Sequence, residues 1–352
     1  MTLEEIKRRA PKLPEDDIYM QSQKKWDAIA KPLRSLGKLE DMINRIAAIQ
    51  NTLDVSINKR AVIAMCADNG IVAEGVTQTD SSVTAVVAEN MARGISSVCK
   101  MGEVANASVI PVDIGMLTEV AHENMLQRKV ACGTKNFAVT PAMSEEQMEK
   151  AIITGIELVR DCKEKGYKIL ATGEMGIGNT TTSTAVACAL LGLSSDTVTG
   201  RGAGLSDEGL QKKRKVIQDA IRFYDLKEDE HYRILQCVGG FDLAGLTGVF
   251  LGGAYYKMPI VIDGAITAAA ALLAFRIHKE CAAYMLASHC SREPMMQMVL
   301  EELGLEAVIY ADMALGEGTG AVMLFPMLDM ALSVYAQNVT FDDIRIEAYQ
   351  PL

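Results

Sequence analysis

The sequence predicts an α/β protein built on a parallel sheet. Short apolar runs recur along the chain, Asp or Glu follows each run among glycines, and a helix-length segment comes next. Continuous apolar runs bounded by glycine are typical of strands that are buried on both faces. Strands that alternate with helices form parallel sheets with right-handed crossovers. The strand segments that we expect are 61–70, 108–115, 168–179, 234–242, 258–265 and 307–318.

Two of the intervening segments, 144–166 and 206–225, are predicted helices. The first begins at Ser144, and Gln147 follows at the spacing of a capping box. This pattern fixes where the longer of the two helices should start.

The two ends of the chain differ from its middle, because residues 3–50 and 327–337 have helical patterns without strand signals. We therefore expect a small helical domain formed by residues 1–30 and 327–352. It would pack beside a large α/β domain formed by residues 31–326.

The composition of the 352-residue chain excludes several classes of protein. Hydrophobic residues make up 49% of it and charged residues 23%, which suits a packed core and excludes disorder. The formal net charge is −10. Nucleic-acid binding needs a basic stripe that displaces counterions, so we expect no nucleic-acid partner.

We expect a cytoplasmic protein without a leader, a membrane span or a metal site. The segment MTLEEIKRRAPKLPEDD is charged throughout and has no apolar h-region. The longest apolar stretch, 259–275, contains Asp263 and is too short to span a membrane. The eight cysteines include no CxxC pair, which favours reduced core thiols over a zinc site or a disulfide framework.

An acidic residue comes at the end of each expected strand. The carboxyl ends of parallel strands share one edge of the sheet, where open α/β folds bind ligands. One such acid can simply cap the next helix, but six predict an electronegative cleft for a metal or for a cationic substrate or transition state. These acids are Asp68, Asp113, Glu174, Asp242, Asp263 and Glu317.

The segment GEMGIGNTTT (173–182) is a candidate phosphate cradle. Its glycines allow backbone amides to approach an oxyanion, and Asn179 and Thr180 open a helix whose first N–H groups are free. It lacks the Lys of a Walker loop and the glycine spacing of a dinucleotide site. The alternative is a tight strand-to-helix turn capped by threonine.

A second glycine cluster, GRGAGLSDEGLQKKRK (200–215), holds the densest basic run of the chain. Most of its cations would suit a solvated helix face, but one of them could bind a phosphate as a point charge. The candidates are Arg201, Lys212, Lys213, Arg214 and Lys215.

Two further segments carry polar groups on loops. In ALGEGTGA (314–321), Glu317 lies between two glycines and is a candidate general base, or simply a helix-capping acid. The segment LASHCSREP (286–294) holds His289 and Ser291 but no GxSxG elbow, so a serine hydrolase is excluded and the histidine suits a structural role.

These segments, taken in order, resemble the nicotinate-nucleotide:dimethylbenzimidazole phosphoribosyltransferase family, which activates the lower ligand of cobamides. The resemblance runs from about Lys31 to about Phe325, and its most specific pair is GEMGIGNTT with LGEGTGA. It implies a Rossmann-like parallel sheet with flanking helices plus a small helical domain formed by both termini. It also implies a dimer. The matching segments are KPLRSLGKLE, CADNGI, GEMGIGNTTT, GRGAGL, VGGFDLAGLTG, VIDGAITAAAAL, SHCSREP and LGEGTGA.

The resemblance implies that the 5-phosphoribosyl group of nicotinate mononucleotide passes to a lower-ligand base such as 5,6-dimethylbenzimidazole. The products are an alpha-riboside phosphate and nicotinate. Glu317 matches the general base, and Glu174 matches a second active-site glutamate near the ribose. No metal or cofactor is implied, because the pyridinium leaving group is already cationic. The expected substrate-binding residues are Gly176, Gly178, Asn179, Thr180, Gly202, Lys213, Asp242, Asp263, Ser291, Ser81 and Val86.

The chain departs from the family pattern on the acceptor side. Val86, in VTAVVA (83–88), replaces a glutamine associated with the benzimidazole pocket, and Ala265 replaces a common phenylalanine. A site that loses a hydrogen-bond partner discriminates more by shape. Two alternatives therefore stay open beside an azole acceptor in a homodimer. One is a phenol or p-cresol acceptor, with the chain as one subunit of a heterodimer with a paralogue; the other is a non-catalytic nucleotide-binding paralogue.

Overall fold

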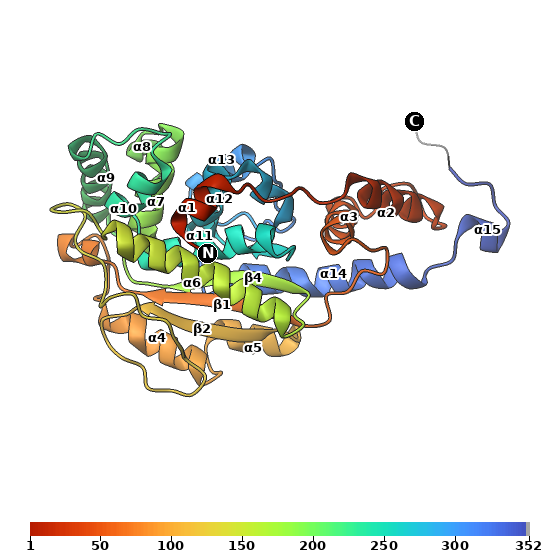
Figure 1. Cartoon of the computed structure of the whole chain (residues 1–352), viewed down its shortest axis with the longest axis horizontal. Coiled ribbons are helices and arrows are strands. Elements are labelled where there is room, and N and C mark those ends of the chain that lie inside the picture. Colours follow the sequence, from red (N-terminus) through yellow and green to blue (C-terminus); the bar gives the residue numbers. More distant parts are fainter. Residues whose placement is uncertain (350–352) are drawn as a thin grey trace.

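The computed structural model describes residues 1–349 and contains one six-stranded sheet in the order β3-β2-β1-β4-β5-β6. Every neighbouring pair of strands is parallel. The predicted parallel α/β sheet with flanking helices is confirmed (Figure 1). The strands are β1 (Arg60–Ala67), β2 (Ser108–Gly115), β3 (Leu126–Gln127), β4 (Ile169–Met175), β5 (Ile260–Ile262) and β6 (Met285–Ala287).

Helices cover both faces of the sheet (Figure 1). The predicted helices at 144–166 and 206–225 are confirmed as α6 and α9, and the Ser144–Gln147 capping box is present. The α-helices are α1 (Leu3–Arg8), α2 (Asp16–Ala28), α3 (Lys38–Gln50), α4 (Ser82–Ala92), α5 (Ser97–Val104), α6 (Glu145–Glu164), α7 (Asn179–Leu191), α8 (Ser195–Val198), α9 (Asp207–Phe223), α10 (His231–Val238), α11 (Phe241–Tyr255), α12 (Ala265–Ile277), α13 (Met295–Glu302), α14 (Thr319–Gln337) and α15 (Phe341–Ile344). Two 3-10 helices are η1 (Gly70–Glu74) and η2 (Lys279–Tyr284).

Four of the six expected strands are present, and the one expected at 234–242 is wrong. That segment forms the end of α10 and the start of α11. Ile234, Leu235 and Val238 are buried together on one face of α10, which is helical spacing. A short apolar run fits a strand or a buried helix equally well, so the run alone could not distinguish between these two structures.

The strand expected at 307–318 is also wrong, because only Ile309 forms an isolated parallel bridge, with His289. The edge position next to β5 belongs instead to β6, which has three residues. Three residues carry too short an apolar pattern for the sequence to reveal a strand.

Each face of the sheet has its own core because successive side chains of β1 point to opposite faces. Ile63 and Met65 pack with α6, α7, α11 and α12, whereas Val62 and Ala64 pack with α3, α4, α5 and α14. Helices α6 and α11 touch through glycine: a Cβ on Gly155 would lie 2.0 Å from the Gly245 carbonyl oxygen. The sheet is therefore enclosed on both sides, and its carboxyl edge remains as the place for a site.

The C-terminal half of α14 packs against α2 and α3, away from the sheet (Figure 1). The rings of Trp26 and Tyr335 lie 5.0 Å apart, and the Tyr335 hydroxyl lies 2.9 Å from Ser22 Oγ. This packing joins segments from both ends of the chain. The expected boundary at 326/327 falls inside α14.

Helix α1 does not join this bundle but packs against the α/β core. The Leu3 N–H donates to Glu149 of α6 at 2.8 Å, and Leu3 and Ile6 belong to the core of the α6 face. The division into residues 1–30 with 327–352 and residues 31–326 stays a prediction.

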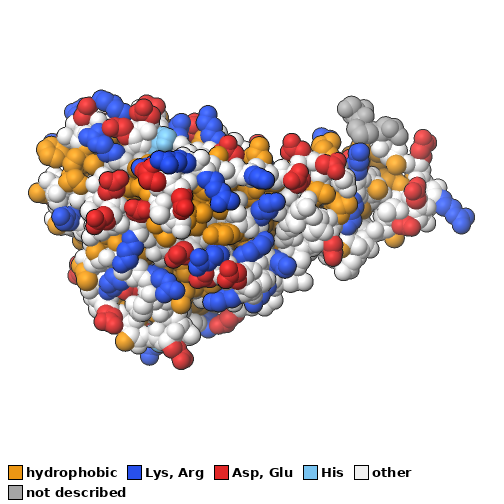
Figure 2. Space-filling model, in the orientation of Figure 1, with side chains coloured by type: hydrophobic (Ala, Val, Ile, Leu, Met, Phe, Trp, Pro, Cys, Tyr) orange, Lys and Arg blue, Asp and Glu red, His pale blue; other side chains and the backbone are white. Residues whose placement is uncertain are grey.

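Within residues 1–349, α14 is the one helix long and apolar enough to cross a membrane. Half of its apolar window is buried, it contains Pro326, and its Asp329 pairs with Arg60 at 2.8 Å. These are features of a core helix. Lys and Arg side chains are interspersed with Asp and Glu on the face seen in Figure 2, which shows no basic stripe there.

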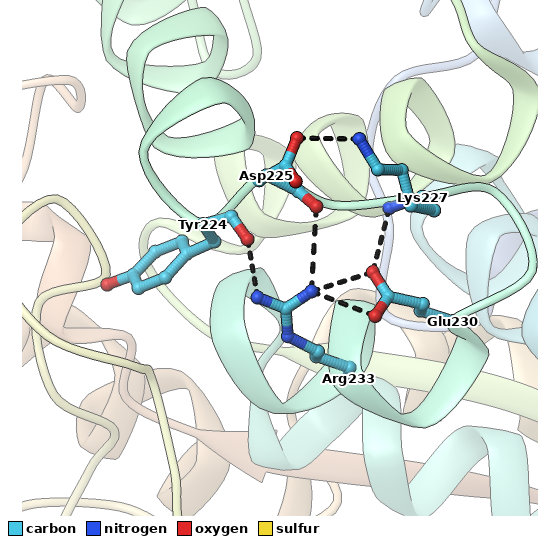
Figure 3. Close-up of polar contacts among 5 residues, drawn as sticks. All are labelled: Tyr224, Asp225, Lys227, Glu230 and Arg233. Carbon is cyan, nitrogen blue, oxygen red and sulfur yellow. Dashed lines mark hydrogen bonds and ion pairs between the residues drawn. The ribbon is translucent and has the colours of Figure 1, made fainter.

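A polar network fixes the junction between α9 and α10 (Figure 3). Arg233 donates to both carboxylate oxygens of Glu230, at 2.9 and 2.7 Å, and to the carbonyl oxygen of Tyr224 at 2.5 Å. Lys227 pairs with Asp225 at 2.6 Å. The network anchors the end of α9, whose first half carries Lys213.

Candidate active site

A cavity of about 310 Å³ opens at the carboxyl ends of β4, β5 and β6. Larger cavities elsewhere, one of about 570 Å³ beside β2, include neither candidate glutamate. Parts of the chain distant in sequence line the smaller cavity: Val87, Glu174, Met175, Gly176, Ile177, Asn179, Thr180, Gly202, Ala203, Asp263, Gly264, Ala265, Ile266, Thr267, His289, Ser291, Glu293, Ala314, Leu315, Gly316 and Glu317.

The first wall is the turn from β4 to α7. Glu174 lies at the end of β4, and Gly178 adopts a left-handed φ of 94° directly before the helix. A Cβ on Gly176 would lie 2.5 Å from the Ala67 carbonyl oxygen and 2.8 Å from an Asp242 carboxylate oxygen. Glycine is required there because the turn crosses directly over the end of β1.

Glu174 is buried, and the side-chain amide of Asn179 donates to its carboxylate. Burial raises the pKa of Glu174 to about 8, partly opposed by the Asn179 hydrogen bond. The neighbouring Asp242 is also buried, and burial raises its pKa to about 6. Glu174 on the cavity wall and Asp242 behind it are therefore carboxyl groups whose charged forms lack solvation, and a cation bound there would favour those charged forms.

The second wall is the turn before α14. Glu317 is half-buried at a left-handed φ of 63°, between Gly316 and Gly318, which are also left-handed. One of its carboxylate oxygens accepts the Val98 N–H at 3.0 Å. The sequence prediction placed Glu317 after a strand; the structure places it in a loop that the N-terminus of α5 orients.

Asp263 connects the second wall to β5. Its carboxylate accepts the backbone N–H groups of Gly318 at 3.2 Å and Ala321 at 3.0 Å. It is fully buried, and burial raises its pKa to about 7 against these hydrogen bonds. An acid at the start of α14 also satisfies N–H groups that the helix leaves free.

The two walls touch through Gly173. A Cβ at Gly173 would lie 2.4 Å from the Glu317 carbonyl oxygen, and one at Gly316 would lie 2.5 Å from Glu174 Oε1. The glycines therefore allow the two glutamate-bearing turns to lie side by side on one cavity.

A buried lysine lies behind the first wall. Lys213 of α9 is fully buried, and its Nζ donates to Thr180 Oγ1 at 2.9 Å and to the Gly200 carbonyl oxygen at 3.3 Å. Burial lowers its pKa to about 8. Of the basic run, Lys212 and Lys215 are exposed, so the buried cation is the one that faces the cavity side.

Most residues named from the sequence come together here. Gly178, Lys213 and Asp242 stand directly behind the lining residues. Ser81 and Val86 do not line the cavity; Val86 is 58% exposed, and its neighbour Val87 is the lining residue of α4. One position along a helix turns a side chain by about 100°, so the sequence could not choose between them.

Asp68 directly follows β1 and Asp113 lies near the end of β2, but both side chains bind loop residues. Asp68 accepts the Leu117 N–H at 2.7 Å, and Asp113 pairs with Lys129 at 3.2 Å. The expected cleft of six acids is therefore smaller than predicted. In residues 1–349, no cluster of three or more His, Cys, Asp or Glu side chains has the arrangement of a metal site.

Besides Thr267, two polar residues of the cavity were not assigned to it from sequence. His289 is buried, its Nδ1 lies 3.2 Å from Ser288 Oγ, and burial lowers its pKa to about 4. Glu293 accepts the Gly202 N–H at 3.1 Å. Both lie in LASHCSREP, whose density of polar groups was the available signal.

The comparisons with known proteins agree with this geometry. The phosphoribosyltransferase family model matches residues 12–346. Nicotinate-nucleotide–dimethylbenzimidazole phosphoribosyltransferase of Ruminiclostridium cellulolyticum is 41% identical over 336 residues, covering 96% of each chain. Its namesake in Acetivibrio thermocellus is 42% identical over 329 residues, covering 94% of each.

Among solved structures, CobT from Thermus thermophilus superposes with a TM-score of 0.90 at 36% identity, covering 95% of this chain and all of that one. The family model and the relatives extend over nearly the whole chain, including both glutamate-bearing turns. The chain therefore belongs to the nicotinate-nucleotide–dimethylbenzimidazole phosphoribosyltransferase family.

Proposed function

We propose that this chain transfers the 5-phosphoribosyl group of nicotinate mononucleotide to 5,6-dimethylbenzimidazole or a similar lower-ligand base. The products are an alpha-riboside phosphate and nicotinate. One observation carries the proposal: Glu174 and Glu317, on two touching turns, share a cavity with the polar groups in front of buried Lys213. Such a site offers carboxylates to a cationic sugar and a cation to its phosphate.

The phosphate would bind at the first turn. Gly176, Gly178, Asn179 and Thr180 lie at or just before the N-terminus of α7, where the helix dipole favours an anion. Gly202 lies across from them, since a Cβ there would meet Thr180 Oγ1 at 2.9 Å. Lys213 supplies the charge from behind Thr180.

The sugar would then lie between the two glutamates. In the reaction, the glycosidic bond breaks with its electron pair going to the pyridinium nitrogen, which leaves as neutral pyridine. The acceptor nitrogen bonds to the anomeric carbon, and Glu317 takes the proton that this nitrogen loses. Glu174, in its ionised form, stabilises the positive charge that develops on the sugar. The expected nucleotide-binding residues also include Asp242, Asp263 and Ser291.

The acceptor would occupy the apolar part of the cavity, where Val87, Ile266 and Leu315 lie. These side chains suit a flat aromatic base. The relatives described above carry dimethylbenzimidazole in their names, and no contact in the cavity favours a phenol over an azole. A role for Ser81 and Val86 at this end stays a prediction.

We also propose that the protein is a cytoplasmic homodimer that needs no metal or other cofactor. In support of the dimer, the exposed Val86 and Leu315 lie near the acceptor end of the cavity, and Met323 and Met330 of α14 are also exposed. Apolar side chains of this kind suit an interface with a second copy. Light scattering of the purified chain tests the dimer, because a monomeric mass would contradict it.

The decisive experiment is a chromatographic turnover assay with nicotinate mononucleotide and three acceptors: dimethylbenzimidazole, adenine and p-cresol. We expect nicotinate and a riboside phosphate with dimethylbenzimidazole, and loss of both in Glu317→Ala although the nucleotide still binds. Product from p-cresol alone would establish the phenolic acceptor. Nucleotide binding without any product would contradict the single-chain enzyme and favour a missing paralogue subunit or a non-catalytic protein.

A further inference from the structure

A carboxylate lies beside the candidate phosphate cradle, against the second glycine cluster. Glu293 stands just before α13, and its Oε1 accepts the Gly202 N–H at 3.1 Å. Its other oxygen lies against Gly200, where an added Cβ would be 2.0 Å from it. Gly200 and Gly202 belong to the backbone around the Lys213 ammonium. The Glu293 carboxylate therefore occupies a place that would suit an anionic ligand.

The charge of Glu293 also acts on the lysine. Burial lowers the pKa of Lys213, and the negative charge of Glu293 raises it in part. The cradle therefore contains one cation and one internal anion that partly balance each other. This balance explains how a lysine with no direct ion pair among the described contacts is kept in a buried place.

A substrate phosphate and the Glu293 carboxylate would compete for the same groups. Two anions a few ångströms apart in a partly buried site repel each other strongly. The Gly202 N–H also has one proton to donate and cannot serve both fully. Glu293 is on a half-buried loop position, so a change of its side-chain rotamer is enough to release the amide.

We propose that Glu293 is an internal competitor for the phosphate-binding groups: its carboxylate occupies the phosphate position in the free protein, and the 5′-phosphate of the donor displaces it. This inference rests on the proposed function, since it takes a phosphorylated nucleotide as the donor. Displacement lowers the apparent affinity for every phosphate, because the binding-competent state is only a fraction of the free protein. A nucleoside without the phosphate leaves Glu293 in place and escapes this penalty.

Glu293→Gln keeps the size of the side chain and removes its charge. We expect the KM for nicotinate mononucleotide to fall about threefold to tenfold, which is the gain when the charge-assisted hydrogen bond of the competing side chain becomes a neutral one. The inhibition constant of nicotinate riboside, which has no phosphate, should not change. The assay runs at pH 6.0 so that Lys213, whose pKa is about 8, stays charged.

Glu301→Gln is the matched control, because Glu301 is exposed on α13, the helix that directly follows Glu293, and lies outside the cavity. It should leave both constants unchanged. A rise in the KM for the nucleotide in Glu293→Gln, or equal shifts for nucleotide and riboside, would overturn the proposal. Either result would make Glu293 a supporting or ribose-binding group.

Calorimetry with inorganic phosphate separates this proposal from the proposed function. Glu293→Gln should bind inorganic phosphate about threefold to tenfold more tightly than the unmodified chain, whether or not either protein turns over nicotinate mononucleotide. If Glu293→Gln binds phosphate more tightly but neither protein turns over nicotinate mononucleotide, the proposed reaction is contradicted and the competition between Glu293 and phosphate is supported. If turnover occurs but Glu293→Gln binds phosphate no more tightly than the unmodified chain, the proposed reaction is supported and the role of Glu293 is refuted.

Discussion

The turn before α7 and the turn before α14 are similar in sequence but differ in surroundings. Each carries a glutamate among glycines, and each helix follows a glycine with nearly the same left-handed φ, 94° at Gly178 and 98° at Gly318. Glu174 is buried and bonded to Asn179, whereas Glu317 is half-buried and bonded to the Val98 N–H.

This difference shows that environment, not residue type, separates two carboxyl groups in one cavity. Burial raises the pKa of Glu174 to about 8, so the free protein keeps most of it neutral at pH 7. Glu317 is more open to solvent and to an incoming acceptor. Pairs of acids placed in such different surroundings are how one site divides proton transfer from charge stabilisation.

The largest test of this comparison is activity. Glu317→Gln should lower kcat by about 10²–10⁴-fold, the usual contribution of a general base, and leave the KM for nicotinate mononucleotide within a few-fold. Glu174→Gln should lower kcat less, because it keeps the buried hydrogen bond with Asn179. Chromatographic initial rates measure both. Equal losses in kcat would show that the two acids do not have separate roles in proton transfer and charge stabilisation.

A second test compares the two glycines. Alanine strains the left-handed φ by about 1–2 kcal/mol at either position. At Gly318 its Cβ would also lie 2.6 Å from Val62 Cγ1, whereas at Gly178 the nearest atom is 3.1 Å away. Gly318→Ala should therefore destabilise the protein about 1–3 kcal/mol more than Gly178→Ala.

Urea unfolding measures these free energies. Gly166→Ala is the control, because Gly166 has a φ of 83° with no atom within 4 Å of an added Cβ and reports backbone strain alone. If Gly318→Ala lost no more stability than Gly166→Ala, the second turn would be less tightly packed than the structure has it.

The smallest expected effect concerns pH and stability. Because folding raises the pKa of Glu174, the folded protein holds a proton that the unfolded chain loses above about pH 4.5. The stability from this group is full below that pH and disappears as the pH rises towards 8. Relative to Glu174→Gln, the unmodified protein should thus lose about 1 kcal/mol or more between pH 5 and 8.5.

Urea midpoints across that pH range test the prediction. Glu145→Gln, at the exposed start of α6, shows the effect of removing a surface charge. Parallel stability curves for Glu174→Gln and the unmodified protein would mean that Glu174 is already ionised in the folded state.

The sequence by itself determined the parallel sheet and the position of both glutamate-bearing turns. β1, β2, β4 and β5 stand where apolar runs end in glycine and an acid, because the buried strand and the turn that follows it are local patterns. The same locality explains the errors at 234–242 and 307–318. At 234–242 the short apolar run belongs to a buried helix, and at 307–318 it makes only an isolated bridge through Ile309.

The tertiary structure alone decided which polar groups share the cavity. Val87 instead of Val86 lines it, Asp68 and Asp113 hold loops, and Glu293 reaches Gly202 across 91 residues of chain. These outcomes depend on the face that each helix turns inwards and on contacts between distant segments. Local composition does not encode such contacts; packing of the whole chain around the sheet does.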